Sequence, residues 1–204
     1  MRAATVILSF VLSCICANAQ EQHREVPKFT FGAVWGYVAT VIYGYHTNFF
    51  SPEGYRVDYR DITASLHNNA EVYFHAGYNL SPEWNISAYL GYAGFYDVQT
   101  IVPFSIRGTR FFGTNHMDDR WFCFADLGTG ICVKKNPQET LCGKLGGGYR
   151  LSLSRLTKLD FVASVRMTYA HIDINYKGYE IVPNQINRNN AYTAAVSFGL
   201  SITF

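Results

Sequence analysis

Charged residues are scarce in this 204-residue chain: Asp, Glu, Lys and Arg together make up 16% of it, against about a quarter in ordinary soluble domains. The formal net charge is only +2, which gives no reason to expect nucleic acid as a partner. Long apolar runs are missing as well, since no stretch after the N-terminal segment approaches the roughly 18 consecutive apolar residues of a transmembrane helix. The composition therefore indicates neither a nucleic-acid-binding protein nor a helical membrane protein, and nothing in it marks a second domain.

The N-terminus has the features of an export signal. A basic Arg2 is followed by an apolar run over residues 3–15 and by the small-residue triplet Ala17-Asn18-Ala19. This order is typical of a cleavable secretory signal. We therefore expect residues 1–19 to be removed and residues 20–204 to form one exported domain.

Aromatic residues, by contrast, are abundant, with 15 Tyr and 15 Phe. In the last segment, residues 191–204, the even positions from Tyr192 onward are apolar or aromatic apart from Ala194, whereas the odd positions are small or polar. Side chains with a period of two belong to a strand that has one apolar and one polar face. Seven earlier segments alternate in the same way, so we predict an all-β chain with strands at 29–43, 71–80, 84–92, 102–109, 121–132, 141–152, 158–169 and 192–204.

The connections between these strands differ in length. Residues 44–69 and 171–190 are rich in polar and turn-forming residues, and we predict two long loops there. The connections after the second, fourth and sixth strands are short. Long and short connections thus alternate imperfectly: the one after the third strand is unexpectedly short, and the one after the fifth, residues 134–139, is compact.

A chain of alternating strands that ends in Ser201-Ile202-Thr203-Phe204 resembles the small outer-membrane β-barrel proteins of Gram-negative bacteria. The resemblance covers the whole mature chain and implies an eight-stranded antiparallel up-and-down transmembrane β-barrel in the outer membrane, with its long loops outside the cell. It implies outer-membrane lipid and lipopolysaccharide as surroundings, the barrel-assembly machinery as a partner, and an extracellular partner of unknown identity. It implies no cofactor. The assembly signal that it implies consists of Phe198, Leu200, Ile202 and Phe204.

The charged residues that fall within strands share the parity of the polar face. They are Glu71, Arg107, Asp126, Lys144, Arg150, Asp160 and Arg166. An eight-stranded barrel is just wide enough to be filled by its own side chains, and buried ions persist only when they are paired. We therefore predict an ionic network that fills the lumen, in preference to a path for protons or ions.

Cysteine is sparse, with five residues in the chain. Cys14 and Cys16 raise the alternative of a lipoprotein cleavage site, although Val11-Leu12-Ser13 matches the usual lipobox poorly. Cys132 and Cys142 have inward parity on two neighbouring strands, and a simple hairpin centred on Pro137 would place them opposite each other. Because the extracytoplasmic compartment is oxidising, we predict a Cys132–Cys142 disulfide; the alternative is that both are simply small apolar residues.

The run at 143–148 (G-K-L-G-G-G) looks superficially like a phosphate-binding loop, but it lacks the Gly-Lys-Ser/Thr ending and does not lie between a strand and a helix. Glycines over which large neighbouring side chains lean are the better interpretation. Two other functions remain as alternatives. The Gly-Ala-Val-Trp sequence near the first strand suggests a lipocalin-like secreted barrel as one alternative. Such a barrel would hold its apolar face inside, around a ligand. A lipid-A-modifying enzyme would use a histidine at the rim; its candidate residues are His46, His67 or His171 with Ser51, Ser65 or Glu53. We favour a non-enzymatic barrel with a structural or surface-interaction role, carried by its extracellular loops.

Overall fold

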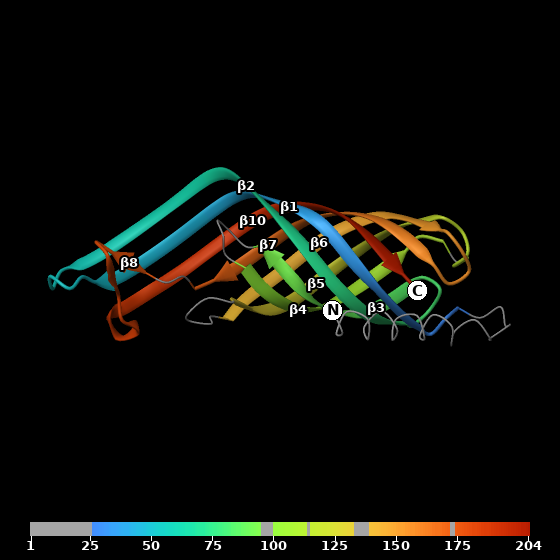
Figure 1. The fold of residues 1–204 in the computed structure, drawn as a ribbon, viewed down its shortest axis with the longest axis horizontal. Coiled ribbons are helices and arrows are strands. Elements are labelled where there is room, and N and C mark those ends of the chain that lie inside the picture. The colour runs from blue at the N-terminus through green and yellow to red at the C-terminus, as the bar shows by residue number, and fades with distance from the viewer. Residues whose placement is uncertain (1–25, 95–99, 114, 133–138, 172–173) are drawn as a thin grey trace, which may run out of the picture.

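The computed structural model shows an all-β protein whose strands close into a barrel (Figure 1). It describes residues 26–94, 100–113, 115–132, 139–171 and 174–204, so the expected signal, residues 1–19, lies outside the described residues. The wall consists of β1 Phe29–Phe50, β2 Arg56–Asn79, β3 Trp84–Gly94, β4 Thr100–Phe111, β5 Arg120–Cys132, β6 Glu139–Ser152, β7 Lys158–Ala170 and β10 Ile186–Thr203. Neighbours pair antiparallel in the order β1-β10-β7-β6-β5-β4-β3-β2, and β2 closes on β1. The predicted eight-stranded antiparallel barrel is confirmed.

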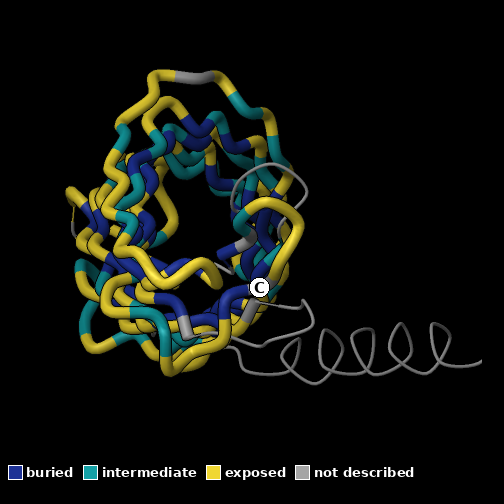
Figure 2. The backbone as a smooth tube through the Cα atoms, turned by 90° about the vertical axis from the view of Figure 1, so that its left-hand side faces the viewer, coloured by how far each residue is buried: buried dark blue, intermediate teal, exposed yellow. Residues whose placement is uncertain are grey.

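The two faces of the wall differ as the alternation predicts. Large apolar side chains such as Phe74 and Leu127 point outward and are 66% and 71% exposed. Polar and charged side chains point inward and are buried, so buried and exposed positions alternate around the ring of strands (Figure 2). A lipocalin-like barrel would have the opposite arrangement, with the apolar face inside.

The two ends of the barrel also differ. The connections after β2, β4 and β6 lie at the same end as the C-terminus, which we call the turn end (Figure 1). At the other end, β1, β2 and β10 continue well beyond their neighbours as a three-stranded sheet (Figure 1). We call this sheet the blade; it comprises residues 42–50 of β1, 56–64 of β2 and 186–190 of β10.

The blade corrects the prediction of two long loops. Residues 44–69 are strand apart from the turn between Phe50 and Arg56, and residues 186–190, predicted as loop, are the start of β10. These segments resemble loops in composition because the blade stands clear of the barrel, and its only buried apolar cluster among the described residues is the small one around Phe49. Pairing with neighbouring strands nevertheless keeps them extended.

A β-bulge separates the blade from the barrel wall. The register shifts between Thr40 and Ile42 on both sides of β1, and an extra residue of this kind reverses which face the following side chains occupy. Tyr43, which the alternation placed on the apolar outer face, therefore lies opposite the buried Thr193 on the inner face. This part of the prediction was wrong.

A small hairpin packs against the inner face of the blade. Its strands are β8 Asn175–Tyr176 and β9 Tyr179–Glu180, and a short 3-10 helix, η2 Pro183–Gln185, follows. Lys177 and Gly178 form the turn with φ values of 50° and 84°, as a tight hairpin of two turn residues requires. Phe49, Ile174 and Ile181 form a buried cluster beneath it. In the part of the chain that the structure describes, no helix is long and apolar enough to cross a membrane.

Candidate functional site

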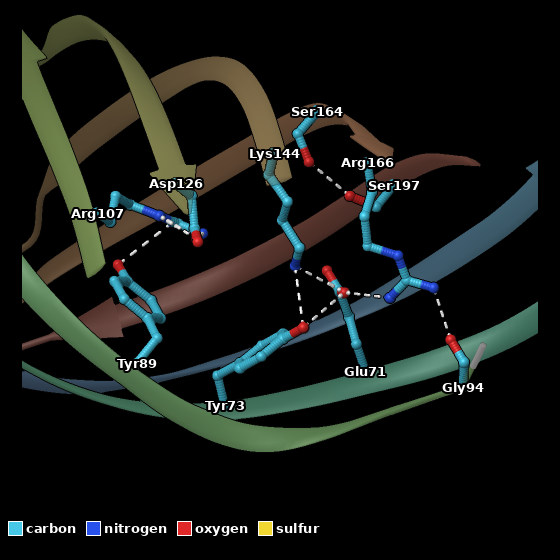
Figure 3. A network of polar contacts seen from close by, with 10 residues as sticks. All are labelled: Glu71, Tyr73, Tyr89, Gly94, Arg107, Asp126, Lys144, Ser164, Arg166 and Ser197. Atoms are coloured by element: carbon cyan, nitrogen blue, oxygen red, sulfur yellow. Dashed lines mark hydrogen bonds and ion pairs between the residues drawn. The ribbon is translucent and has the colours of Figure 1, made fainter. Parts of the chain in front are cut away.

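The centre of the lumen is occupied by one carboxylate that holds two cations. Glu71 on β2 lies 2.8 Å from the Lys144 ammonium and 3.5 Å from the Arg166 guanidinium (Figure 3). Lys144 also donates to the Tyr73 hydroxyl at 3.1 Å, and Arg166 donates to the carbonyl of Gly94 at 2.6 Å. Strands from opposite sides of the barrel are thereby joined across the lumen, because β6 and β7 do not pair with β2 in the sheet.

A second pair lies toward the turn end. Arg107 and Asp126 are directly opposite each other on β4 and β5. The Arg107 guanidinium donates to Asp126 Oδ2 from Nε at 3.1 Å and from Nη2 at 2.9 Å. The same guanidinium lies 4.0 Å from the ring centroids of Tyr89 and Phe124, an arrangement in which the charge is attracted by both π faces. This pair therefore fills one section of the lumen without leaving an unmatched charge.

A third pair closes the lumen near the turn end. Arg150 and Asp160 face each other on β6 and β7, with two parallel bonds of 2.6 Å and 2.7 Å from Nε and Nη2 to the two carboxylate oxygens. This fork geometry is among the strongest that a charged pair can adopt. The centroid of the Phe111 ring lies 4.3 Å from this guanidinium and 4.1 Å from that of Arg120.

All seven charged residues that the sequence placed on the inner face lie there, and each belongs to an ion pair. Four further residues of the filling were not predicted as part of the lumen network: Tyr73, Tyr89, His75 and Arg120. His75 stacks on Tyr89 at 5.0 Å. Inward parity was the signal that could have identified the two tyrosines and the histidine, but aromatic residues on the polar face were read as part of the general alternation.

The lumen is a packed interior along this stretch. A cavity of about 30 Å³ remains beside His75, Asn85 and Arg107, which is enough for a water molecule or two. Gly146 and Gly148 do not form a phosphate-binding loop. They lie beneath the rings of Phe124 and Phe122, where an added Cβ would collide with each ring.

The predicted disulfide is not supported by the strand register. Cys142 lies opposite Gly128 on β5, and its thiol is free. Cys132 is four positions further along β5, about 13 Å at the usual rise per residue, whereas a disulfide requires Cα atoms within about 7 Å. Because Ile131 faces Glu139, the hairpin is centred two positions earlier than the predicted centre at Pro137.

This correction gives a direct chemical prediction. When the purified chain is unfolded without reductant and treated with an alkylating reagent, we expect Cys142 to be modified in full. In the folded barrel the buried Cys142 should be protected, while the exposed Cys123 should react with a membrane-soluble reagent. Mass spectrometry of the digested protein checks both results; a Cys142 that becomes reactive only after reduction would contradict the register.

Three of the residues considered for an enzyme, two histidines and one glutamate, have other partners. His46 lies 2.9 Å from Asp58, and His171 bonds the carbonyl of Asn189. Glu53 pairs with Lys177 at 3.0 Å. Among the described residues, no group of three or more His, Cys, Asp or Glu side chains could hold a metal ion.

No protein-family model and no curated protein sequence matches the chain. Solved structures with a similar fold include Neisserial surface protein A, at 14% identity and a TM-score of 0.46, covering 86% of this chain and 97% of that one. The outer membrane protein OprG from Pseudomonas aeruginosa is 11% identical with a TM-score of 0.48, covering 90% and 98%. Ail, the attachment invasion locus protein of Yersinia pestis, is 10% identical with a TM-score of 0.35, covering 87% and 100%. At these identities the likeness concerns the fold alone.

The strand topology, the outer surface and the lumen of this chain all indicate the same architecture. Eight antiparallel strands close into a barrel, apolar side chains cover its outside, and paired charges fill its inside. The chain has the architecture of a small eight-stranded outer-membrane β-barrel.

Proposed function

We propose that this protein is anchored in an outer membrane by a sealed barrel and that it acts through the blade, as a structural or surface-interaction protein. The observation that carries the proposal is the outer wall. It exposes large apolar side chains on every strand, an arrangement that water would disfavour and hydrocarbon would favour.

The dimensions of the wall support a membrane location. The five shorter strands, β3 to β7, are 11 to 14 residues long, and a tilted strand of about 9–11 residues spans the hydrocarbon core. Exposed aromatic residues lie at both ends of this wall, as in the aromatic girdles of membrane barrels. They include Phe29, Trp84 and Trp121 at the turn end and Tyr92, Tyr169 and Tyr192 at the blade end.

The packed lumen argues for an anchor over a pore. Glu71, Lys144 and Arg166 meet at its centre with hardly any exposure, Arg166 being 1% exposed. Parting these ions would leave buried charges unpaired, which is costly in a low-dielectric interior. We therefore assign the interaction role to the blade, which extends beyond the wall on what we propose is the extracellular side.

This proposal predicts how the protein fractionates. It should be recovered with the outer membrane, and the folded barrel should migrate faster on a gel before heating than after it. In a planar bilayer the purified protein should give no discrete conductance steps. Recovery as a monomer that stays soluble without detergent would contradict the membrane anchor and favour a secreted ligand-binding barrel, and regular conductance steps would contradict the sealed lumen.

A further inference from the structure

The outer face of the blade carries its arginines. The pairing register places Gly44 between Tyr192 and Ile62, both exposed on the outer side. Two residues further along β1, on the same face, His46 lies between Asn190 and Arg60. The next such position, Asn48, lies between Arg188 and Asp58, and Phe50 at the tip faces Arg56.

The positively charged residues of the blade lie on its outer face only. Arg56, Arg60 and Arg188 are all exposed there, whereas the inner face of the blade presents Tyr43, Tyr45, Thr47, Phe49, Val57, Tyr59, Asp61 and Thr63 and has neither Lys nor Arg. One carboxylate accompanies the three guanidinium groups. It belongs to Asp58, whose pKa is lowered by the hydrogen bond from His46, so it is ionised at neutral pH.

The guanidinium groups are largely free to bind a ligand. Arg56 donates from Nε to the Asn48 side chain at 3.0 Å, which orients the group and leaves its terminal nitrogens available. Among the described residues, Arg60 and Arg188 have no ion-pair partner. Guanidinium groups of this kind bind phosphate through two parallel hydrogen bonds.

The height of the arginines above the wall indicates which phosphates they meet. Tyr169 and Tyr192 are paired neighbours on β7 and β10 and form the aromatic row at the blade end of the wall. Such aromatic rows lie at the level of the lipid headgroups. Arg60 belongs to the first outward-facing row beyond it, Arg188 to the second, and Arg56, opposite Phe50, to the third.

We propose that Arg56, Arg60 and Arg188 form a binding site for the phosphate groups of lipid headgroups in the leaflet that surrounds the blade. The inference rests on the proposed membrane location and adds to it a ligand class and three residues. Each positive charge at an anionic membrane surface strengthens binding roughly fivefold, so three together contribute about 100-fold. The site also gives the blade a preferred side, because its arginine face is held toward the lipid and its tyrosine face toward the barrel mouth.

The test uses the full mature chain, folded in an uncharged detergent. Its affinity for lipid A and for dephosphorylated lipid A is measured by native mass spectrometry. The chain is compared with a triple variant, Arg56→Gln, Arg60→Gln and Arg188→Gln. The matched control is Arg110→Gln, because Arg110 is also an exposed outward arginine but lies at the turn end, beside Trp84 and Phe112.

We expect the parent chain to prefer lipid A over its dephosphorylated form, the triple variant to bind lipid A about 100-fold more weakly, and the control to behave as the parent. Equal lipid A binding by parent and triple variant, or an equal loss in the control, overturns the site. Competition by millimolar inorganic phosphate alone would show a free-anion site and overturn the lipid assignment. A chain that remains soluble without detergent overturns the membrane location itself, whereas an inserted barrel with unchanged binding overturns only this site.

Discussion

Replacing Glu71 by Gln is expected to lower the free energy of unfolding by about 3–5 kcal/mol, the usual cost of removing one partner of a buried ion pair. Glu71 is the shared partner of Lys144 and Arg166, with its Oε2 atom accepting from both. A glutamine keeps the shape and one acceptor but carries no charge, so two buried cations would repel each other without compensation. Urea-dependent unfolding of the barrel in lipid vesicles, followed by tryptophan fluorescence, measures the change.

Two further variants make this result specific. Adding Lys144→Met to Glu71→Gln removes one of the unmatched cations, so the double variant should be more stable than Glu71→Gln alone. Glu53→Gln is the control. Glu53 also pairs with a lysine, Lys177, but the side chains of both residues are more than half exposed. That control should unfold with the parent chain. If Glu71→Gln also does so, the central ion cluster does not stabilise the barrel.

Replacing Phe204 by Ala is expected to leave most of the chain unassembled in the cell while its export continues. Phe204 and Phe31 exchange two backbone hydrogen bonds, of 2.7 Å and 3.0 Å, where β1 meets the C-terminal end of the chain. Both bonds are made by main-chain atoms, so alanine retains them. The variant should therefore still fold from urea into detergent micelles, and only its assembly in cells should fail if the side chain is part of the signal proposed for Phe198, Leu200, Ile202 and Phe204.

The experiment compares the assembled, heat-modifiable band in outer-membrane fractions with the amount of chain from which the signal has been cleaved. Phe31→Ala is the matched control, since Phe31 is an outward aromatic on the facing strand and lies outside the proposed signal. Its assembled level should equal that of the parent. Normal assembly of Phe204→Ala would show that the C-terminal aromatic ring is not part of the assembly signal. Failure of both variants would show that the junction between β1 and the C-terminal end of the chain requires aromatic side chains.

The sequence by itself determined the strands of the barrel wall and the direction in which their side chains point. Alternation is a local property, because successive side chains of a strand leave on opposite faces. Phe74 and Leu127 could therefore be placed outside, and Asp126 and Arg150 inside, before any pairing was known. The number of strands followed from the number of alternating segments, whereas their closure into a barrel was implied by the resemblance to outer-membrane β-barrels.

Tertiary structure decided the features that depend on pairing between distant segments. The blade was missed because its polar residues lack alternation, and only the register of β1 with β2 and β10 shows that they are strands. A single bulge near Thr40 moved Tyr43 to the other face, and a shift of two positions in the hairpin register separated Cys132 from Cys142. The hairpin offset leaves no mark on the local pattern, because it changes which residues meet and not how each strand alternates. The bulge, by contrast, reverses the faces of the residues that follow it.

The ion pairs illustrate the same division. The inward parity of Glu71 could be predicted from its neighbours, but its partners Lys144 and Arg166 are 73 and 95 residues away in the chain. They meet because closure of the barrel brings β6 and β7 across from β2, at a height set by the stagger of every strand between them. The sequence therefore determined which charges are buried, and only the closed barrel determined which of them pair.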